Sequence, residues 1–178
     1  MVVILLLLIA TVGGSLSFLW DRFFVTEYVV PVRGVIERFE QSGTPSVGIE
    51  LRAASTVEAS GFSKEMTDPS GKPLFISDKA GLTSADVKAA AVVSVEENFV
   101  IEVEFTEAGA RKLTKLSKEL LVKDRDTATE RLAILLDGKL KGAPAVLKVI
   151  DGGSAQIHLN ELTKAEATKL AKGIVGSE

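Results

Sequence analysis

Residue types that carry out chemistry are sparse in this chain of 178 residues. It has no cysteine, which excludes a disulfide framework and a thiolate metal site. The one histidine, His158, lies in a stretch that alternates as a strand does, on the side opposite Ile157 and Leu159. We therefore expect His158 at a solvated strand position, and histidine-based catalysis is not indicated.

Paired carboxylates are the next candidates for chemistry. Glu102 and Glu104 alternate with apolar residues, so a strand would place both on one face with Cα atoms roughly 6.8 Å apart. A general acid and base of a hydrolase can use that spacing. A solvated sheet face produces the same alternation, and it is the interpretation that we favour.

An acidic stretch later in the chain has some features of a calcium loop. Asp124, Asp126 and Glu130 supply carboxylates, but the glycine that such a loop needs is missing and Ala128 stands at a would-be ligand position. We interpret the segment 123–131 as a charged surface loop. No metal, cofactor or catalytic residue is expected anywhere in the chain.

The chain begins with a long apolar segment. Residues Val2 to Trp20 contain no charge, and 19 helical residues span roughly 28 Å, close to the thickness of a bilayer core. We expect a transmembrane anchor over residues 1–20, with Trp20 at the interface. A cleaved signal peptide is the alternative, since Val2 to Val12 has the length of its apolar region, although no Lys or Arg precedes it.

Charge leaves the orientation of this anchor open and excludes one class of partner. Arg22, Arg33 and Arg38 follow the apolar segment, which by the positive-inside rule favours a cytoplasmic domain. All 21 basic and 24 acidic residues lie beyond it, giving a formal charge of −3 without a basic block. Nucleic-acid binding is therefore not expected.

A stalk and linker are expected over residues 21–45, before a domain at 46–178. Gln41 to Pro45 is dense in turn formers and forms the predicted boundary. After Pro31 the apolar residues have near-helical spacing, which predicts that the stalk is partly helical; they are Val32, Val35, Ile36 and Phe39.

The sequence of the first half of the domain predicts both strands and helices. We expect strands at Val47 to Leu51 and Leu74 to Ile76, with an aperiodic loop at 53–73 between them. A short capped helix is expected from Thr83 to Ala90. A hairpin of Ala91 to Val95 and Phe99 to Phe105 should follow, and then a helix capped by Thr106 whose apolar face comprises Ala110, Leu113, Leu116 and Leu120.

The second half begins with a strand at Leu132 to Leu136 and a tight turn at Asp137-Gly138. Ala143-Pro144 should end the pairing, because proline lacks the N–H that a ladder needs. Further strands are expected at Ala145 to Ile150 and Ala155 to Leu159, followed by a helix with a Thr163 to Glu166 capping box and a stop at Gly173. The whole predicts an α+β two-layer sandwich: a mostly antiparallel sheet with helices on one face.

This ordered series (strand-LDG, APxV, strand, TxxEAxxLA) resembles the head subdomain of the first large periplasmic domain of SecD, a subunit of the SecDF protein-export complex. The resemblance covers about Phe99 to Gly173, including VIEVEFTEAGARKLTKLSKEL. It implies a noncatalytic, membrane-anchored binding module that assists protein export or envelope biogenesis, with its domain outside the cytoplasmic membrane. We give this implication more weight than the small positive-inside bias. The implied partners are the lipid bilayer and either Sec translocon components or an exported polypeptide.

Four residues match the family's motif position by position and are the candidate binding residues: Asp137, Gly138, Ala143 and Pro144. Each also has a structural explanation, since Asp137 can bond its own turn, Gly138 can supply a positive φ, and Pro144 can stiffen a corner. The other transmembrane segments of SecD and its base subdomain have no counterpart here, so a proton-driven motor is not expected of this chain alone. Reuse of the fold in a self-associating structural domain remains the alternative, and a tethered hydrolase using Glu102 and Glu104 or the Asp137 turn is the third.

Overall fold

The computed structural model describes residues 34–177, apart from 69–70, 96–97, 122–128 and 160–161. The expected anchor over residues 1–20, the stalk up to residue 33, and both Asp124 and Asp126 lie outside the described residues. Among the helices that are described, none is both long enough and apolar enough to span a bilayer.

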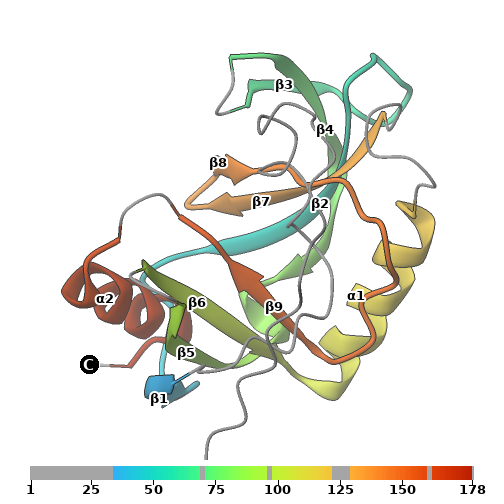
Figure 1. Ribbon diagram of the computed structural model, residues 1–178. Helices are drawn as coiled ribbons and strands as arrows, with labels where there is room; N and C mark the ends of the chain where they lie inside the picture. The colour runs from blue at the N-terminus through green and yellow to red at the C-terminus, as the bar shows by residue number, and fades with distance from the viewer. Residues whose placement is uncertain (1–33, 69–70, 96–97, 122–128, 160–161, 178) are drawn as a thin grey trace, which may run out of the picture.

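The described residues form nine strands in two antiparallel sheets and two α-helices (Figure 1). The first sheet has the strand order β1-β5-β6-β9, and the second has the order β3-β4-β2-β7-β8. The first contains β1 (Gly34–Glu40), β5 (Val87–Val95), β6 (Asn98–Phe105) and β9 (Ser154–Ile157). The second contains β2 (Ile49–Ser55), β3 (Lys64–Thr67), β4 (Pro73–Thr83), β7 (Glu130–Leu136) and β8 (Lys139–Gly142).

The predicted hairpin at the centre of the first sheet is confirmed as β5 and β6, which pair antiparallel from Val87↔Phe105 to Val95↔Asn98. The alternation of β6 places Ile101 and Val103 in the main core, and both are fully buried. Burying a side chain of this size stabilises the fold by about 1.5–3 kcal/mol. The strict period of two thus fixes which face of the sheet turns inward.

Helix α1 (Glu107–Glu119) begins where the sequence predicts. The Thr106 side chain accepts a hydrogen bond from the Gly109 amide at 3.1 Å, which is the N-cap contact. The helix buries Leu113 and Leu116 against the core, and Leu120 follows at its C-cap. The apolar stripe packs against β4 and β6.

Helix α2 (Lys164–Val175) also begins at its predicted cap. Thr163 and Glu166 form a complete capping box, in which each side chain accepts a hydrogen bond from the other residue's backbone amide. Gly173 does not end the helix, because it is buried against Val47 and the helix continues to Val175. Gly176, at φ 65°, is the left-handed C-cap residue.

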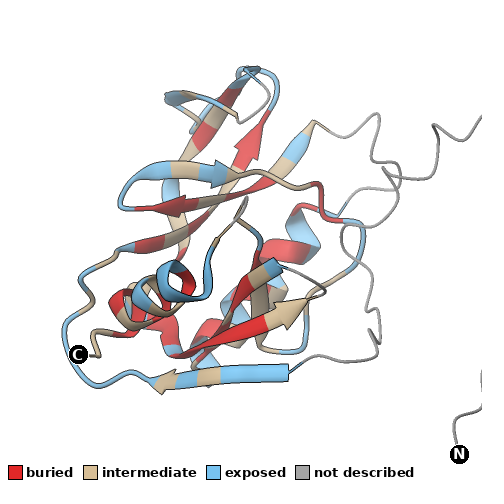
Figure 2. Ribbon diagram, turned by 60° about the vertical axis from the view of Figure 1, so that its left-hand side comes forward, coloured by how far each residue is buried: buried red, intermediate tan, exposed pale blue. Residues whose placement is uncertain are grey.

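One core joins both sheets and both helices. In Figure 1 the two sheets lie one above the other, with α2 on the left and α1 on the right. Figure 2 shows buried residues along the inner sides of all these elements. The main cluster takes Ile49 from β2, Leu132 from β7, Val92 from β5, Leu113 from α1 and Ile174 from α2. The helices therefore stabilise the packing of one sheet on the other.

The joint between the sheets is centred on Asp86, in the 3₁₀ turn Ser84–Asp86 that links β4 to β5. Its carboxylate is nearly buried, accepting from the Thr83 amide at 3.0 Å and from the Lys112 ammonium at 2.7 Å. Its carbonyl accepts from the Thr106 amide at 2.8 Å. Gly109 packs so closely that an added Cβ would lie 2.7 Å from that carbonyl oxygen. One acidic residue thus connects the end of β4 to α1.

Part of the predicted fold class is confirmed: the chain is α+β with antiparallel sheets. The prediction of a single sheet with helices on one face is wrong, because the strands divide between two sheets that share a core. The predicted partly helical stalk is also wrong over Gly34–Glu40, which forms β1 and pairs with β5. Its apolar residues have helical spacing, but pairing with an extended neighbour decides the conformation of so short a segment.

Three further local predictions are wrong. The expected helix from Thr83 to Ala90 is a single 3₁₀ turn followed by β5, because β5 pairs with β1 on one side and with β6 on the other. The expected loop at 53–73 contains β3 and the end of β2. The expected strand at Ala145 to Ile150 is reduced to one parallel bridge between Leu121 and Val146. Its backbone is partly satisfied by side chains instead, since the Ile150 amide donates to Ser117 Oγ at 3.0 Å.

Candidate functional site

The Asp137-Gly138 turn joins β7 to β8 as predicted. Both residues have positive φ, at 49° and 71°, which is the conformation that a two-residue hairpin turn requires. We expected the Asp137 carboxylate to bond its own turn, and that expectation is wrong. The carboxylate accepts from the Gly48 amide at 2.7 Å, while the Asp137 amide donates to the Gly48 carbonyl at 2.8 Å. The residue therefore ties the hairpin to the chain just before β2.

The Ala143-Pro144 step follows directly after β8, which confirms that the pairing ends there. Ala143 packs against the second hydrophobic cluster, on the other face of the larger sheet. The Pro144 carbonyl accepts from the Leu132 amide at 2.9 Å. Both residues are half-buried, whereas Asp137 and Gly138 are exposed. The structure thus places the four motif residues at opposite ends of β8, with only the turn at the surface.

Glu104 lies on the outer face of the first sheet, within an ion-pair network. Its two carboxylate oxygens each lie 2.6 Å from a cation, one from Lys88 Nζ and the other from an Arg38 guanidinium nitrogen. Two hydrogen bonds hold the pKa of Glu104 below its usual value, and the one from Lys88 has a larger effect than the one from Arg38. The group is therefore ionised near neutral pH and serves as an ion-pair partner, which does not suit a general acid.

Glu102 is half-buried on the same face, where Gln156 Nε2 donates to its carboxylate at 3.3 Å. The predicted alternation of these two glutamates with the core residues of β6 is confirmed. His158 is exposed, as expected, but it lies just beyond the end of β9 and not at a strand position. Among the described residues, no group of three or more His, Cys, Asp or Glu side chains is arranged to hold a metal ion.

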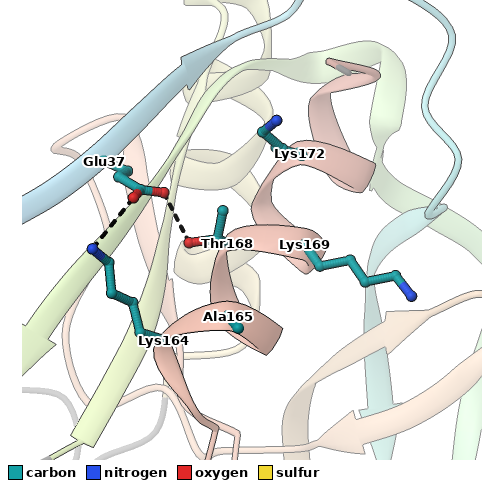
Figure 3. A pocket seen from close by; sticks show the side chains of 6 residues that line it. All are labelled: Glu37, Lys164, Ala165, Thr168, Lys169 and Lys172. Carbon is teal, nitrogen blue, oxygen red and sulfur yellow. Dashed lines mark hydrogen bonds and ion pairs between the residues drawn. The ribbon is translucent and has the colours of Figure 1, made fainter.

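A surface depression of about 570 Å³ lies between β1 and α2, and we call it the β1–α2 groove (Figure 3). It is lined by Glu37 of β1 and by residues of α2: Lys164, Ala165, Thr168, Lys169 and Lys172. Glu37 points toward the helix, accepting from Thr168 Oγ1 at 2.8 Å and lying 3.4 Å from Lys164 Nζ. The hydrogen bond from Thr168 lowers the pKa of Glu37, and the nearby ammonium of Lys164 lowers it further by a smaller amount.

Lys172 also contacts Phe39 of β1, because its ammonium lies 5.7 Å from the centroid of the Phe39 ring. Three lysines and one glutamate give the groove a formal charge of +2, although the whole chain carries −3. Sequence reasoning missed this surface, because Glu37 was assigned to a partly helical stalk. The signal available was on α2, where Lys164, Thr168 and Lys172 recur every four residues and so share a face.

Comparison with known proteins identifies the relatives of this chain. Residues 56–176 match the family described as SecDF, P1 head subdomain. The protein translocase subunit SecD of Magnetococcus marinus is 33% identical over 103 residues, which cover 57% of this chain and 18% of that protein. This chain thus corresponds to a small part of that relative's length.

Two solved structures have a similar fold. One was reported as the structure and function of a membrane component SecDF that enhances protein export; the match has a TM-score of 0.54 and 20% identity, and covers 75% of this chain and 64% of that one. The other is a crystal structure of SecDF in a super-membrane-facing form, with a TM-score of 0.54 and 22% identity, covering 75% and 19% of the two chains. The family match spans every element from β3 to α2. The chain therefore belongs to the SecDF P1 head subdomain family.

Proposed function

We propose that this chain is a noncatalytic binding module that assists protein export at the membrane. The observation that carries the proposal is the family match over residues 56–176. A protein that is 33% identical over 103 residues is named as a translocase subunit, and a SecDF structure of similar fold is described as enhancing protein export. The module would bind components of the Sec translocon or the exported polypeptide itself. The family's fold supports a binding role, while the partner is our inference.

The surface chemistry agrees with binding rather than catalysis. The carboxylates that a hydrolase would need are engaged in structural contacts: Glu104 with Lys88 and Arg38, and Asp137 with the Gly48 amide. The exposed turn at Asp137-Gly138 projects from β7 and β8, and with Ala143 and Pro144 it remains our proposed family-specific contact. In this proposal its backbone shape, set by the two positive φ angles, is what a partner would recognise.

We also propose that residues 1–20 anchor the chain in the membrane with the domain on its outer side. Release by alkaline carbonate separates a peripheral protein from an anchored one, and protease added to intact spheroplasts reports the side. An anchored domain that is digested in intact spheroplasts supports both parts of the proposal. Release by carbonate contradicts the anchor, and protection from external protease contradicts the orientation.

The function is tested by the kinetics of export. Cells lacking the chain should accumulate the precursor of a pulse-labelled secreted protein, and the full chain should restore its maturation. The matched control carries residues 1–33 fused to an unrelated soluble domain, which keeps the proposed anchor and removes every strand and helix of the head, β1 included. Rescue by this control, or normal maturation without the chain, contradicts an export role for the domain. If the full chain self-associates and export is normal without it, the structural alternative is favoured.

A further inference from the structure

We propose that the N-terminal segment Phe23 to Val30 folds back across the outer face of the first sheet and covers three buried apolar side chains there. We call these side chains the outer cluster; they are Ala91 and Val93 of β5 and Val100 of β6. Such docking does not depend on which partner the head binds, because it concerns how the head is held by its own chain.

The outer cluster lies on the side of the first sheet that faces away from the main core. Val92 and Ile101 belong to the main core, and Val93 and Val100 each lie one position along the same strands, so their side chains point the opposite way. An open sheet face in contact with water is usually polar. Val93 and Val100, which pair directly, are only 1% and 2% exposed. Another part of the chain must therefore lie over them.

The described helices and the second sheet do not supply this cover. Both helices and the second sheet contribute apolar side chains to the main core, so they lie on the inner side of the first sheet. Within the described part of the chain, Val95 is the one partly buried apolar residue packed against the outer cluster, and it belongs to β5 itself. The cover therefore comes from a connecting or terminal segment.

Among the segments that lie outside the described residues, the N-terminal one has the composition to cover valines. Residues 23–30 read FFVTEYVV, with six apolar or aromatic side chains and one charge. The internal segments are short or strongly polar: 69–70 reads PS, 96–97 reads EE, 122–128 reads VKDRDTA and 160–161 reads NE. Burying a carboxylate against valine side chains without a partner is costly. Composition therefore selects residues 23–30.

The N-terminal segment is also in the right place and long enough. It leads into β1 at Gly34, and the next residue, Val35, pairs with Val93 and extends the apolar surface to the edge of the sheet, where it is 62% exposed. Pro31 and Gly34 are turn formers that allow the chain to reverse. Crossing from β1 to β6 takes two strand spacings, roughly 9.6 Å. Eight residues span about 12 Å as a helix and about 27 Å when extended, so either conformation reaches both valines.

Docking of this segment has a consequence for the head. The segment follows directly after the proposed anchor at residues 1–20, so the first sheet would be held beside the membrane and would not swing on a free stalk. Its outer face would be closed to partners. The hairpin turn at Asp137, which lies on the other sheet, would stay open.

The test uses cysteine labelling of the full chain in detergent. The chain has no cysteine, so one introduced thiol reports on one position. Val93→Cys should react slowly with a maleimide. Changing the six apolar residues of 23–30 to serine should speed this reaction about tenfold or more, because an uncovered thiol is reactive. The matched control is Val92→Cys, whose side chain is fully buried in the main core and should stay slow in both backgrounds.

Equally slow labelling of Val93→Cys in both backgrounds overturns the proposal, because another segment must then cover the outer cluster. If the serine changes also expose Val92→Cys, the domain has lost its packing, and disulfide formation in the unaltered segment decides. One cysteine replaces Phe24 or Tyr28, and the second replaces Glu102, which lies on the outer face of β6 beside Ala91.

The matched control for this disulfide is Lys115→Cys on α1, which lies on the inner side of the sheet. Mild oxidation should link the segment to Glu102→Cys within one chain and not to Lys115→Cys. Equal linkage to both positions, or to neither, contradicts the docking. Disulfides that form only between two chains assign the cover to a second copy instead. Neither readout requires export, so failure here leaves the proposed function to its own test.

Discussion

Replacing Asp86 tests how the two sheets are joined. The Asp86 side chain is 7% exposed, and it accepts hydrogen bonds from the Thr83 amide and the Lys112 ammonium. The Lys112 side chain is 54% exposed, so solvent screening reduces that ion pair to about 0.5–1 kcal/mol. Leaving the Thr83 amide without its acceptor costs about 1–3 kcal/mol more. We therefore expect Asp86→Ala to lower the free energy of unfolding by about 3 kcal/mol.

Two companion variants separate these contributions. Lys112→Met removes only the ion pair and should cost about 0.5–1 kcal/mol. Asp86→Asn keeps an oxygen for the Thr83 amide and should cost a similar amount, well below the alanine variant. Urea unfolding followed by far-UV circular dichroism measures all three changes. A loss below about 1 kcal/mol for Asp86→Ala, or equal losses for it and Lys112→Met, would refute the role given to the buried carboxylate.

The remaining predictions concern packing, pH and the hairpin. Gly173→Ala should lower the free energy of unfolding by about 1–2 kcal/mol, because the added Cβ would lie 2.6 Å from a Val47 methyl group. This cost should outweigh the better helix propensity of alanine. A variant that is more stable than the parent in urea would contradict this packing. The ion pairs lower the pKa of Glu104 from 4.5 in the folded state. The carboxylate therefore adds to the free energy of unfolding above pH 4.5, and this stabilisation is lost as the pH falls through the folded-state pKa. Glu104→Gln should therefore be less stable than the parent near neutral pH and equal to it in acid, and a pH-independent difference would be inconsistent with the ion pairs. Asp137→Ala should cost about 1–2 kcal/mol and Asp137→Asn clearly less, since asparagine tolerates positive φ and retains an acceptor; equal melting temperatures for the two variants would exclude this explanation.

Local signals with a specific physical cause were predictable from the sequence. The caps at Thr106 and Thr163, the hairpin turn at Asp137 and the inward face of β6 each follow from hydrogen bonding or alternation within a few residues. The family resemblance over the second half rests on the same signals. These elements are locally consistent with the global fold, which is why short-range reasoning recovers them.

What the sequence did not reveal depends on pairing between distant segments. Glu37 meets Thr168 across 131 positions, and no periodicity near either residue indicates that contact. The carboxylate of Asp137 bonds Gly48, which is 89 positions away, rather than its own turn. The division of the strands into two sheets likewise depends on how β2 lies between β4 and β7. Tertiary contacts of this kind override local preference, so β1 and the groove beside it were missed.

The central claim is that this head subdomain assists export by binding. It is tested most directly by crosslinking in intact cells and affinity capture of the full chain from the native membrane, with the 1–33 fusion as the control. Our account predicts that translocon subunits or nascent exported chains are captured with the full chain and not with the fusion. If neither is captured, or if the fusion captures them equally, the head does not bind the export machinery and only the assignment to the family remains.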